Sequence, residues 1–570
     1  MAERLNLRDA ALAAVLAVLA LGPAILLPGY VLVGDMVFVP DQPWKSTWLG
    51  ADGSVPRAVP SDAVISLLGW ALPGSLVQKL VLFLTLFGAG LGAARLVGDR
   101  SQVARLAAMV LFVWNPFVYG RLAIGHWALL VGYAALPWVA KGARDLRAGT
   151  GAGWPGLALS LLVAAWSSPT GGVLAAGVAL LFLLPSPRLL IGTLATVVLA
   201  NLPWLVPGMV NSRVRVADGF GVDAFAARAD TPWGVPGSVL GLGGMWKESI
   251  DAPGRGSLLL SGAGLAVVAA GLVGLFVLRR REHWTAIALS GATMLGLALA
   301  LLPTFAAGEQ VARWLVGEVP GGGLIRDSQK FVALVALAAA VGIAYGMDWL
   351  RERIAGAGPV PFVALAVLPV LVLPGLGWGL LGKFAPVQYP AEWEQVRSVM
   401  QEQGAEAQRT VVLPFSLYRR FDWNADKAVL DPAPRFFPGE VVIDDALVVR
   451  GGTVAGEDPL AARIRAAGDS PSALAAVLQE EGIAWALVHV EGPGDVTLPP
   501  GEVVHRGDRL ALVRVGGDGP ARTSQWAPAA VTASVVSALF GLAMFGMSLR
   551  RTWRAYTHGR ENHQTRGGHG

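Results

Sequence analysis

Long apolar stretches separated by short polar segments run through most of the chain. A membrane-spanning helix needs about 20 consecutive apolar residues. The pattern predicts about twelve spans, which we expect at 9–29, 75–97, 103–120, 127–140, 154–167, 171–185, 188–208, 257–278, 284–303, 331–349, 359–381 and 527–549. The stretches between 127 and 185 are short and interrupted by prolines. The overall prediction is a polytopic α-helical membrane protein.

One long segment, 384–525, departs from this pattern and has the composition of a soluble domain. Short apolar runs at 409–415, 484–490 and 510–515 favour buried strands, and 472–481 favours a helix. The order of these elements predicts a small α/β domain. We therefore divide the chain into a transmembrane domain (1–383), a soluble domain (384–525), a final transmembrane helix (526–550) and a tail (551–570).

Basic residues lie at alternate ends of the predicted spans, and this asymmetry predicts the topology. Cytoplasmic loops of membrane proteins carry an excess of Lys and Arg. With the N-terminus in the cytoplasm, every even-numbered span ends in a basic cluster: Arg95/Arg100/Arg105, Lys141/Arg144/Arg147, Arg188, Arg279/Arg280/Arg281, Arg351/Arg353 and Arg550/Arg551/Arg554. Both termini are then cytoplasmic, and the soluble domain and the long loops lie outside, where we expect any chemistry.

The composition agrees with a plasma-membrane protein in contact with lipid. Hydrophobic residues make up 54% of the 570 residues and charged ones only 15%, against about 25% charged in soluble proteins. The net charge of +5 comes from basic residues that flank apolar runs, so we expect no nucleic-acid partner. The absence of cysteine excludes disulfides and thiolate chemistry. The sequence contains no convincing phosphate-binding loop, so we do not expect ATP-driven transport.

The first predicted outer loop carries the candidate catalytic carboxylates. Asp35 follows Gly34 a few residues beyond the first span, and Asp41 comes later in the same loop. A carboxylate near the membrane surface can act as a general base toward a sugar hydroxyl, or hold a divalent metal ion. A solvated loop aspartate would give the same pattern.

Two further clusters supply candidate anion-binding residues. Arg121 and His126 lie between two predicted spans, where they could hold a phosphate or a sugar; an interfacial aromatic belt with a snorkelling arginine is the alternative. Arg326 and Lys330 lie beside a glycine run where the tenth span begins. Free N–H groups and the helix dipole there favour an anionic ligand. A capped helix start with an Arg–Asp pair at the interface is the alternative.

These motifs resemble those of the C-type (GT-C) glycosyltransferase superfamily, and in particular actinobacterial cell-envelope arabinofuranosyl- and mannosyltransferase-like proteins. The resemblance rests on Gly34-Asp35, on 115–126 with Tyr133 and 136–138, on 326–331, and on 389–393 with 413–418. It implies a polyprenyl-phosphate sugar donor, an envelope glycan or glycolipid acceptor, and a catalytic acidic residue at Asp35 or Asp41. It also implies that Arg326, Lys330, Arg121 and His126 bind the donor phosphate.

The chain departs from the family pattern because no acidic pair stands in the first outer loop. Two alternatives therefore stay open: a non-catalytic scaffold that binds envelope glycan, and a transporter of lipid-linked glycans. The enzymatic hypothesis makes one geometric demand. The Asp35 loop and the start of the tenth span must converge into one cavity facing away from the cytoplasm, with the Asp35 carboxylate near the Arg326 guanidinium.

Overall fold

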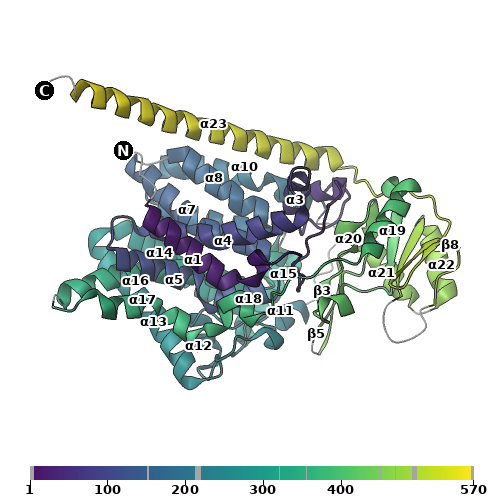
Figure 1. Ribbon diagram of the computed structural model, residues 1–570, viewed down its shortest axis with the longest axis horizontal. Coiled ribbons are helices and arrows are strands. Elements are labelled where there is room, and N and C mark those ends of the chain that lie inside the picture. Colours follow the sequence, from purple (N-terminus) through teal and green to yellow (C-terminus); the bar gives the residue numbers. More distant parts are fainter. Residues whose placement is uncertain are drawn as a thin grey trace.

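The computed structural model describes residues 6–150, 153–211, 220–319, 321–354, 356–449, 451–468, 470–490 and 497–566, without the side chains of 552 and 554–566. Figure 1 shows a body of packed helices with a sheet at one end, and one long helix, α23, along the outside. The long helices are α1 (Leu7–Leu21), α4 (Gly74–Val97), α5 (Gln102–Val113), α7 (Trp127–Ala148), α8 (Gly153–Ser167), α9 (Pro169–Leu183), α10 (Pro187–Asn211), α13 (Leu258–Arg281), α14 (His283–Leu301), α15 (Ala306–Glu318), α16 (Val332–Arg353), α17 (Pro359–Val372) and α23 (Ala527–Arg566).

Shorter helices connect them. They are α2 (Pro23–Leu26), α3 (Ser61–Gly69), α6 (Pro116–Ala123), α11 (Phe220–Ala224), α12 (Gly234–Leu240) and α18 (Gly377–Leu381). Helix α6 begins directly after α5 because Asn115 caps it, accepting a hydrogen bond from the Val118 N–H, and Pro116 occupies its first turn.

Seven helices in the described residues are long and apolar enough to cross a membrane: Gly74–Val97, Gln102–Ala123, Pro187–Asn211, Leu258–Arg281, His283–Thr304, Ser328–Arg353 and Ala527–Arg551. An eighth span is possible if α17 and the segment Pro374–Leu381, bent by 68° from it, are taken together. The chain is thus a helical membrane protein. The expected count of about twelve is not confirmed.

The difference has local causes. The predicted span 9–29 ends as a 15-residue helix at Leu21, because Gly22 takes a positive φ and Pro23 starts a new helix. The predicted spans 154–167 and 171–185 are the 15-residue helices α8 and α9, separated at Ser168, which caps α9 ahead of Pro169. Helix α7 is longer than the predicted 127–140 and carries charged residues in its second half.

Helix α16 is the centre of the helical body, and it packs against α5, α13 and α14. An apolar stretch of 18 residues in Ser328–Arg353, which contains this helix, is 83% buried inside the protein. The corresponding stretch of the peripheral helix α23 is 17% buried. Small residues allow the closest contact: a Cβ on Gly274 would lie 2.0 Å from the Gly342 carbonyl oxygen. Close backbone approach at glycines stabilises helix pairs where lipid provides no hydrophobic driving force.

The sheet at the end of the body has five strands in the order β4-β1-β7-β9-β8, with β4, β1 and β7 parallel and β9 antiparallel to its neighbours. Their bounds are β1 (Arg409–Leu413), β4 (Glu440–Val442), β7 (Trp485–His489), β8 (Glu502–Arg506) and β9 (Leu510–Arg514), with the small ribbons β2 (Tyr418–Arg419)–β3 (Val429–Leu430) and β5 (Leu447–Val449)–β6 (Gly452–Val454). The strands predicted at 409–415, 484–490 and 510–515 are confirmed as β1, β7 and β9.

Helices cover the sheet and attach it to the body. They are α19 (Ala391–Glu402), α20 (Ala433–Phe436), α21 (Pro459–Ala467) and α22 (Pro471–Glu480), the last matching the helix predicted at 472–481. Leu460, Ile464 and Leu478 pack with strand residues in one cluster, whereas Trp393 of α19 joins the core that continues into the membrane helices. The unit is therefore α/β, as predicted, and it shares a core with the helical body.

Candidate functional site

The loop that carries Asp35 is held between two other segments by backbone hydrogen bonds. On one side the Asp35 N–H donates to the Ile124 carbonyl at 3.0 Å, in the connection between α6 and α7. On the other side the Gly34 N–H donates to the Ala428 carbonyl, and the Leu430 N–H donates to the Gly34 carbonyl, both at 2.8 Å. Segments far apart in the sequence thus fix the backbone on both sides of Asp35.

Two glycines allow this close packing. Gly34 and Gly125 both have positive φ, 53° and 83°. A Cβ on Gly34 would lie 2.0 Å from the Ile124 carbonyl oxygen, and one on Gly125 would lie 2.2 Å from the Val33 carbonyl oxygen. Neither position has room for a side chain. The dipeptides Gly34-Asp35 and Gly125-His126 therefore bring a carboxylate and an imidazole together.

A chain of polar side chains begins at Asp35 and leads into the protein. The Asp35 Oδ2 lies 3.2 Å from His126 Nε2, and Asp35 Oδ1 accepts a hydrogen bond from the Tyr418 hydroxyl. The other ring nitrogen of His126, Nδ1, lies 3.1 Å from Arg121 Nη1. Because a guanidinium can only donate, Nδ1 must accept. The ring proton is then on Nε2 and points to Asp35.

Arg121 forms the buried end of this chain, with a side chain that is 0% exposed. Its Nη1 donates to Asp327 Oδ2 at 2.8 Å, and its Nη2 donates to Gln329. Gln329 in turn donates to the Gly243 carbonyl at 2.9 Å. A buried guanidinium requires such pairing, since an unpaired charge in the interior costs several kcal/mol. Arg121 on α6 is thus anchored to the segment that leads into α16.

Lys330 adds a second cation beside Asp327. Its Nζ lies 3.7 Å from Asp327 Oδ2, and its side chain is 23% exposed. The side chain of Asp35 is 40% exposed and that of His126 17%. The cluster therefore opens toward solvent at Asp35, with Lys330 also accessible, and closes at Arg121.

The surroundings lower the pKa values of Asp35, Asp327 and His126, which favours the ionised carboxylates and the neutral imidazole. Desolvation raises the pKa of Asp35, but hydrogen bonds from His126 and Tyr418 and nearby positive charge outweigh it, so the pKa lies below its usual value. Desolvation likewise opposes ionisation of Asp327, yet the charges of Arg121 and Lys330 hold its pKa far below the usual range. For His126, desolvation and the cations Arg121 and Lys330 lower the pKa more than Asp35 raises it.

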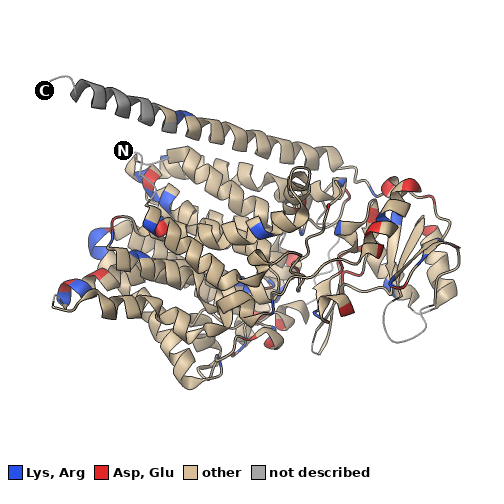
Figure 2. Cartoon of the chain, in the orientation of Figure 1, with Lys and Arg blue, Asp and Glu red and all other residues tan. Residues whose placement is uncertain are grey.

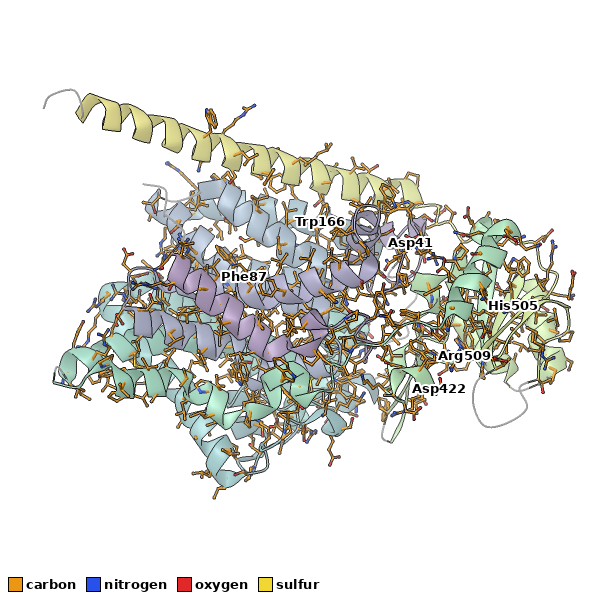
Figure 3. The ribbon with its side chains drawn as sticks, in the orientation of Figure 1. Asp41, Phe87, Trp166, Asp422, His505 and Arg509 are labelled. Carbon is orange, nitrogen blue, oxygen red and sulfur yellow. The ribbon has the colours of Figure 1, made fainter. Side chains whose placement is uncertain are left out.

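Two of the predicted site residues lie outside this cluster. The Asp41 side chain is 64% exposed, and its nearest cation is Arg397 of α19, at 3.8 Å; Figure 3 shows it where the helical body meets the sheet. Arg326 pairs with Glu457 at 3.6 Å and lies over the Phe225 ring. The structure therefore groups Asp35, His126, Arg121 and Lys330 and leaves Asp41 and Arg326 apart.

Three cluster members were not among the predicted site residues. Asp327 and Gln329 lie inside the motif 326–331, and a buried Arg121 in need of a counter-ion is the signal that points to them. Tyr418 lies in an aromatic segment that sequence patterns assign equally well to packing. No group of three or more His, Cys, Asp or Glu that could hold a metal ion occurs among the described residues.

Two neighbouring cavities lead from the membrane helices toward the cluster. One lies between α5, α13 and α17 and is lined mostly by apolar residues, with Asn115 and Arg255 among them. The second shares Arg255 with the first, is also lined by Asp230 and Asp251, and reaches Gln329, the partner of Arg121. A small, partly polar space thus adjoins the buried end of the polar chain.

A helical body with a small α/β unit near the C-terminus is the fold expected from the sequence. The same fold occurs in the solved structure of arabinofuranosyltransferase AftD from mycobacteria, with a TM-score of 0.55 and 17% sequence identity over 91% of this chain. A mutant form of AftD gives a TM-score of 0.53 at 16% identity, again over 91% of this chain.

The chain covers 40% of the length of the AftD chain and 42% of that of the mutant form. No family model and no curated protein matches its sequence. At these identities the likeness to AftD establishes a shared fold, and that agrees with the resemblance expected from the sequence.

Proposed function

We propose that this protein is a membrane glycosyltransferase that moves a sugar from a polyprenyl-phosphate donor to a cell-envelope glycan or glycolipid. The observation that carries the proposal is the chain Asp35–His126–Arg121–Asp327, which places an ionised, accessible carboxylate next to buried cations. The AftD fold supports it, because AftD is an arabinofuranosyltransferase. Arabinofuranose is therefore the first sugar to test, and mannose the second.

In this proposal Asp35 is the general base. Its carboxylate takes the proton of the acceptor hydroxyl as that oxygen attacks the anomeric carbon of the donor sugar. The bond between the anomeric carbon and the phosphate oxygen breaks, and the polyprenyl phosphate leaves with the electron pair. General-base catalysis of this kind contributes typically about 10²–10⁴-fold. Neutral His126 donates to Asp35 and keeps the carboxylate oriented.

The cations of the cluster would bind the donor phosphate. Lys330 is the accessible one, and Arg121, held by Asp327 and Gln329, adds positive potential from behind. Arg326 joins them if the donor phosphate displaces Glu457. The divalent metal ion that the sequence leaves open at the Asp35 loop is not required for any of these steps.

The proposal includes the topology and the domain division expected from the sequence. Transfer then takes place on the outer side of the plasma membrane, with residues 384–525 outside and both termini in the cytoplasm. The basic helix ends support this orientation. Arg95, Arg147 and Arg279–Arg281 lie in the last turns of α4, α7 and α13, and Figure 2 shows Lys and Arg gathered at the end of the body away from the sheet.

The test is sugar transfer by the full-length protein in lipid nanodiscs. Polyprenyl phosphate carrying radiolabelled arabinofuranose, or mannose, is incubated with a short synthetic arabinan, and product is separated by chromatography. We expect transfer with one of the donors, and Asp35→Asn should lower kcat by about 100-fold or more. Asp518→Asn, at an exposed position after β9, is the matched control and should behave as wild type.

Two results would contradict the proposal. Full transfer by Asp35→Asn would remove Asp35 as the base. Glycan binding without transfer from any polyprenyl-phosphate donor would favour the scaffold, and movement of intact lipid-linked sugar across liposomes would favour the transporter.

A further inference from the structure

We propose that Tyr418, from the β2–β3 ribbon beyond the membrane helices, is a positioning residue that fixes the Asp35 carboxylate for proton transfer. This inference rests on the glycosyltransferase activity proposed above. It assigns to the α/β unit a direct part in the site, in addition to any part in binding glycan.

The contacts of the Asp35 carboxylate are the first support. Tyr418 donates to Oδ1, and His126 Nε2 lies 3.2 Å from Oδ2. An ionised carboxylate only accepts hydrogen bonds, so both neighbours act as donors. One donor on each oxygen fixes the rotation of the carboxylate about its Cβ–Cγ bond. The rotamer of Asp35 then depends on two side chains from different parts of the fold, separated by almost 300 residues.

The backbone around Tyr418 is the second support, because the ribbon and the Asp35 loop are built together. Tyr418 pairs with Leu430 across the β2–β3 ribbon. The same Leu430 donates its N–H to the Gly34 carbonyl, beside Asp35. Asn424, in the turn of the ribbon, donates to the Leu32 carbonyl at 3.1 Å. The strand that places Tyr418 therefore also places the loop that carries Asp35.

Several other groups act on Asp35, and their effects remain when only Tyr418 is changed. His126 contacts it directly, while Arg435 on α20, Lys247 before the short turn at Glu248–Ile250, and Lys330 act on it through their charge. Arg435 is itself tied to Asp62 on α3 at 3.0 Å. These charges stay in place when the Tyr418 hydroxyl is removed.

The hydroxyl of Tyr418 remains a donor across the physiological range. Burial, and then the charge of Asp35, raise the pKa of Tyr418 well above 10. Its hydrogen bond stabilises the ionised form of Asp35. Losing the bond should free the carboxylate to rotate and raise the pKa of Asp35, so the acidic limb of the activity profile should move to higher pH.

Tyr418→Phe is the test, since it removes the hydroxyl and keeps the ring. We expect kcat to fall about 10- to 100-fold from the loss of orientation, with the KM for the lipid donor changed less than about threefold. The acidic limb of kcat/KM should move up by about one pH unit, the effect of one hydrogen bond to a charged group.

Tyr389→Phe is the matched control. Its hydroxyl donates to the Phe38 carbonyl at 3.0 Å, so the variant loses a hydroxyl from the same junction between the outer loop and the α/β unit without touching Asp35. If Tyr418 only stabilised the junction, both variants would show the same change in the thermal midpoint and neither would move the acidic limb. That result would overturn the proposal.

A readout that needs no activity separates this inference from the proposed function. A water-soluble carbodiimide couples protonated carboxyl groups to an amine, and peptide mass spectrometry follows the labelling of Asp35 against pH. The labelling midpoint should be higher in Tyr418→Phe than in wild type and in Tyr389→Phe. Equal midpoints in all three would contradict the positioning role even if transfer is observed. A shifted midpoint together with full transfer by Asp35→Asn would instead contradict the proposed catalytic function.

Discussion

At the scale of single residues, His126 determines the character of the site. Its Nδ1 faces Arg121 at 3.1 Å, and its Nε2 faces Asp35 at 3.2 Å. Adding a proton to Nδ1 would direct an N–H toward a guanidinium, so the site opposes protonation of this ring. Histidine often titrates near neutral pH, but here it acts as a neutral donor between a cation and an anion.

The first prediction concerns pH. Desolvation and the neighbouring cations lower the pKa of His126, so the ring should remain neutral as pH falls through its ordinary value of 6.5. The pKa of Asp35 is also lowered, so the base stays ionised over the same range. We expect wild-type kcat/KM for transfer to be flat between about pH 6 and 8. An inflection near 6.5 that disappears in His126→Gln would contradict the neutral state assigned to His126.

The second prediction concerns the buried pair of Arg121 and Asp327. Asp327→Asn removes the anion and leaves a guanidinium with 0% exposure short of its charge partner. We expect a loss of about 3–5 kcal/mol in the free energy of unfolding, measured as a lower thermal midpoint in detergent. Asp223→Asn breaks an ion pair to Arg313 in which both side chains are more than 40% exposed, so it should change the midpoint far less. Equal losses would contradict the anchoring role of Asp327.

The third prediction separates the two carboxylates proposed from the sequence. Asp35 contacts His126 and Tyr418, whereas the nearest cation to the Asp41 carboxylate is Arg397, at 3.8 Å. Asp41→Asn should therefore lower kcat much less than Asp35→Asn in the same transfer assay. The reverse order would place the base at Asp41.

Sequence patterns predicted part of this site and could not predict the rest. Asp35, Arg121, His126 and Lys330 were identifiable because polar residues at membrane helix ends are costly to place and therefore informative. Tyr418 was not, because its contact with Asp35 follows from β2–β3 pairing beside Gly34, which no local pattern indicates. Arg326 carries the signal of an anion site, yet a glutamate from the α/β unit pairs with it.

At the scale of elements, strands were easier to predict than spans. The strands β1, β7 and β9 are short runs whose central residues are apolar and buried, and such runs are typical of central strands. The predicted number of spans is not confirmed, because hydropathy does not show where an apolar stretch stops being one helix. Gly22 and Pro23 end a helix inside a stretch that remains apolar, and the predicted spans 154–167 and 171–185 are helices of only 15 residues.

The fourth prediction concerns the loop that holds Asp35. Gly34→Ala would place a methyl group 2.0 Å from the Ile124 carbonyl, besides requiring a left-handed backbone. The loop must then move away from α6–α7, which should separate Asp35 from His126 and abolish transfer.

Gly404→Ala is the control, because Gly404 also has positive φ (69°) but a Cβ there meets nothing within 4 Å. It should cost only about 1 kcal/mol of stability and leave transfer unchanged. If both variants retain transfer, the close packing of this loop is not required.

At the scale of the whole molecule, the helical body has two chemically different ends. At one end, basic and acidic side chains join helix termini: Arg105 pairs with Asp9 of α1, and Arg144 with Glu282 before α14. At the other end lie the Asp35 loop, the α6–α7 connection and the start of α16. The sheet is attached at this second end (Figure 1), partly through Glu457, which pairs with both Arg57 and Arg326. Such a separation is what the positive-inside rule requires if the site faces outward.

The last prediction tests that orientation directly. Because the sequence has no cysteine, any labelling of the protein by maleimide is expected at the introduced thiol. Ser472→Cys places a thiol at an exposed position of α22, and Thr150→Cys places one at an exposed position just after α7, beside the basic end. A membrane-impermeant maleimide should label Ser472→Cys in intact cells and Thr150→Cys only after permeabilisation. A permeant maleimide should label both, which controls for accessibility. The opposite pattern would place Asp35 and Lys330 on the cytoplasmic side, where the proposed transfer at the outer face could not occur.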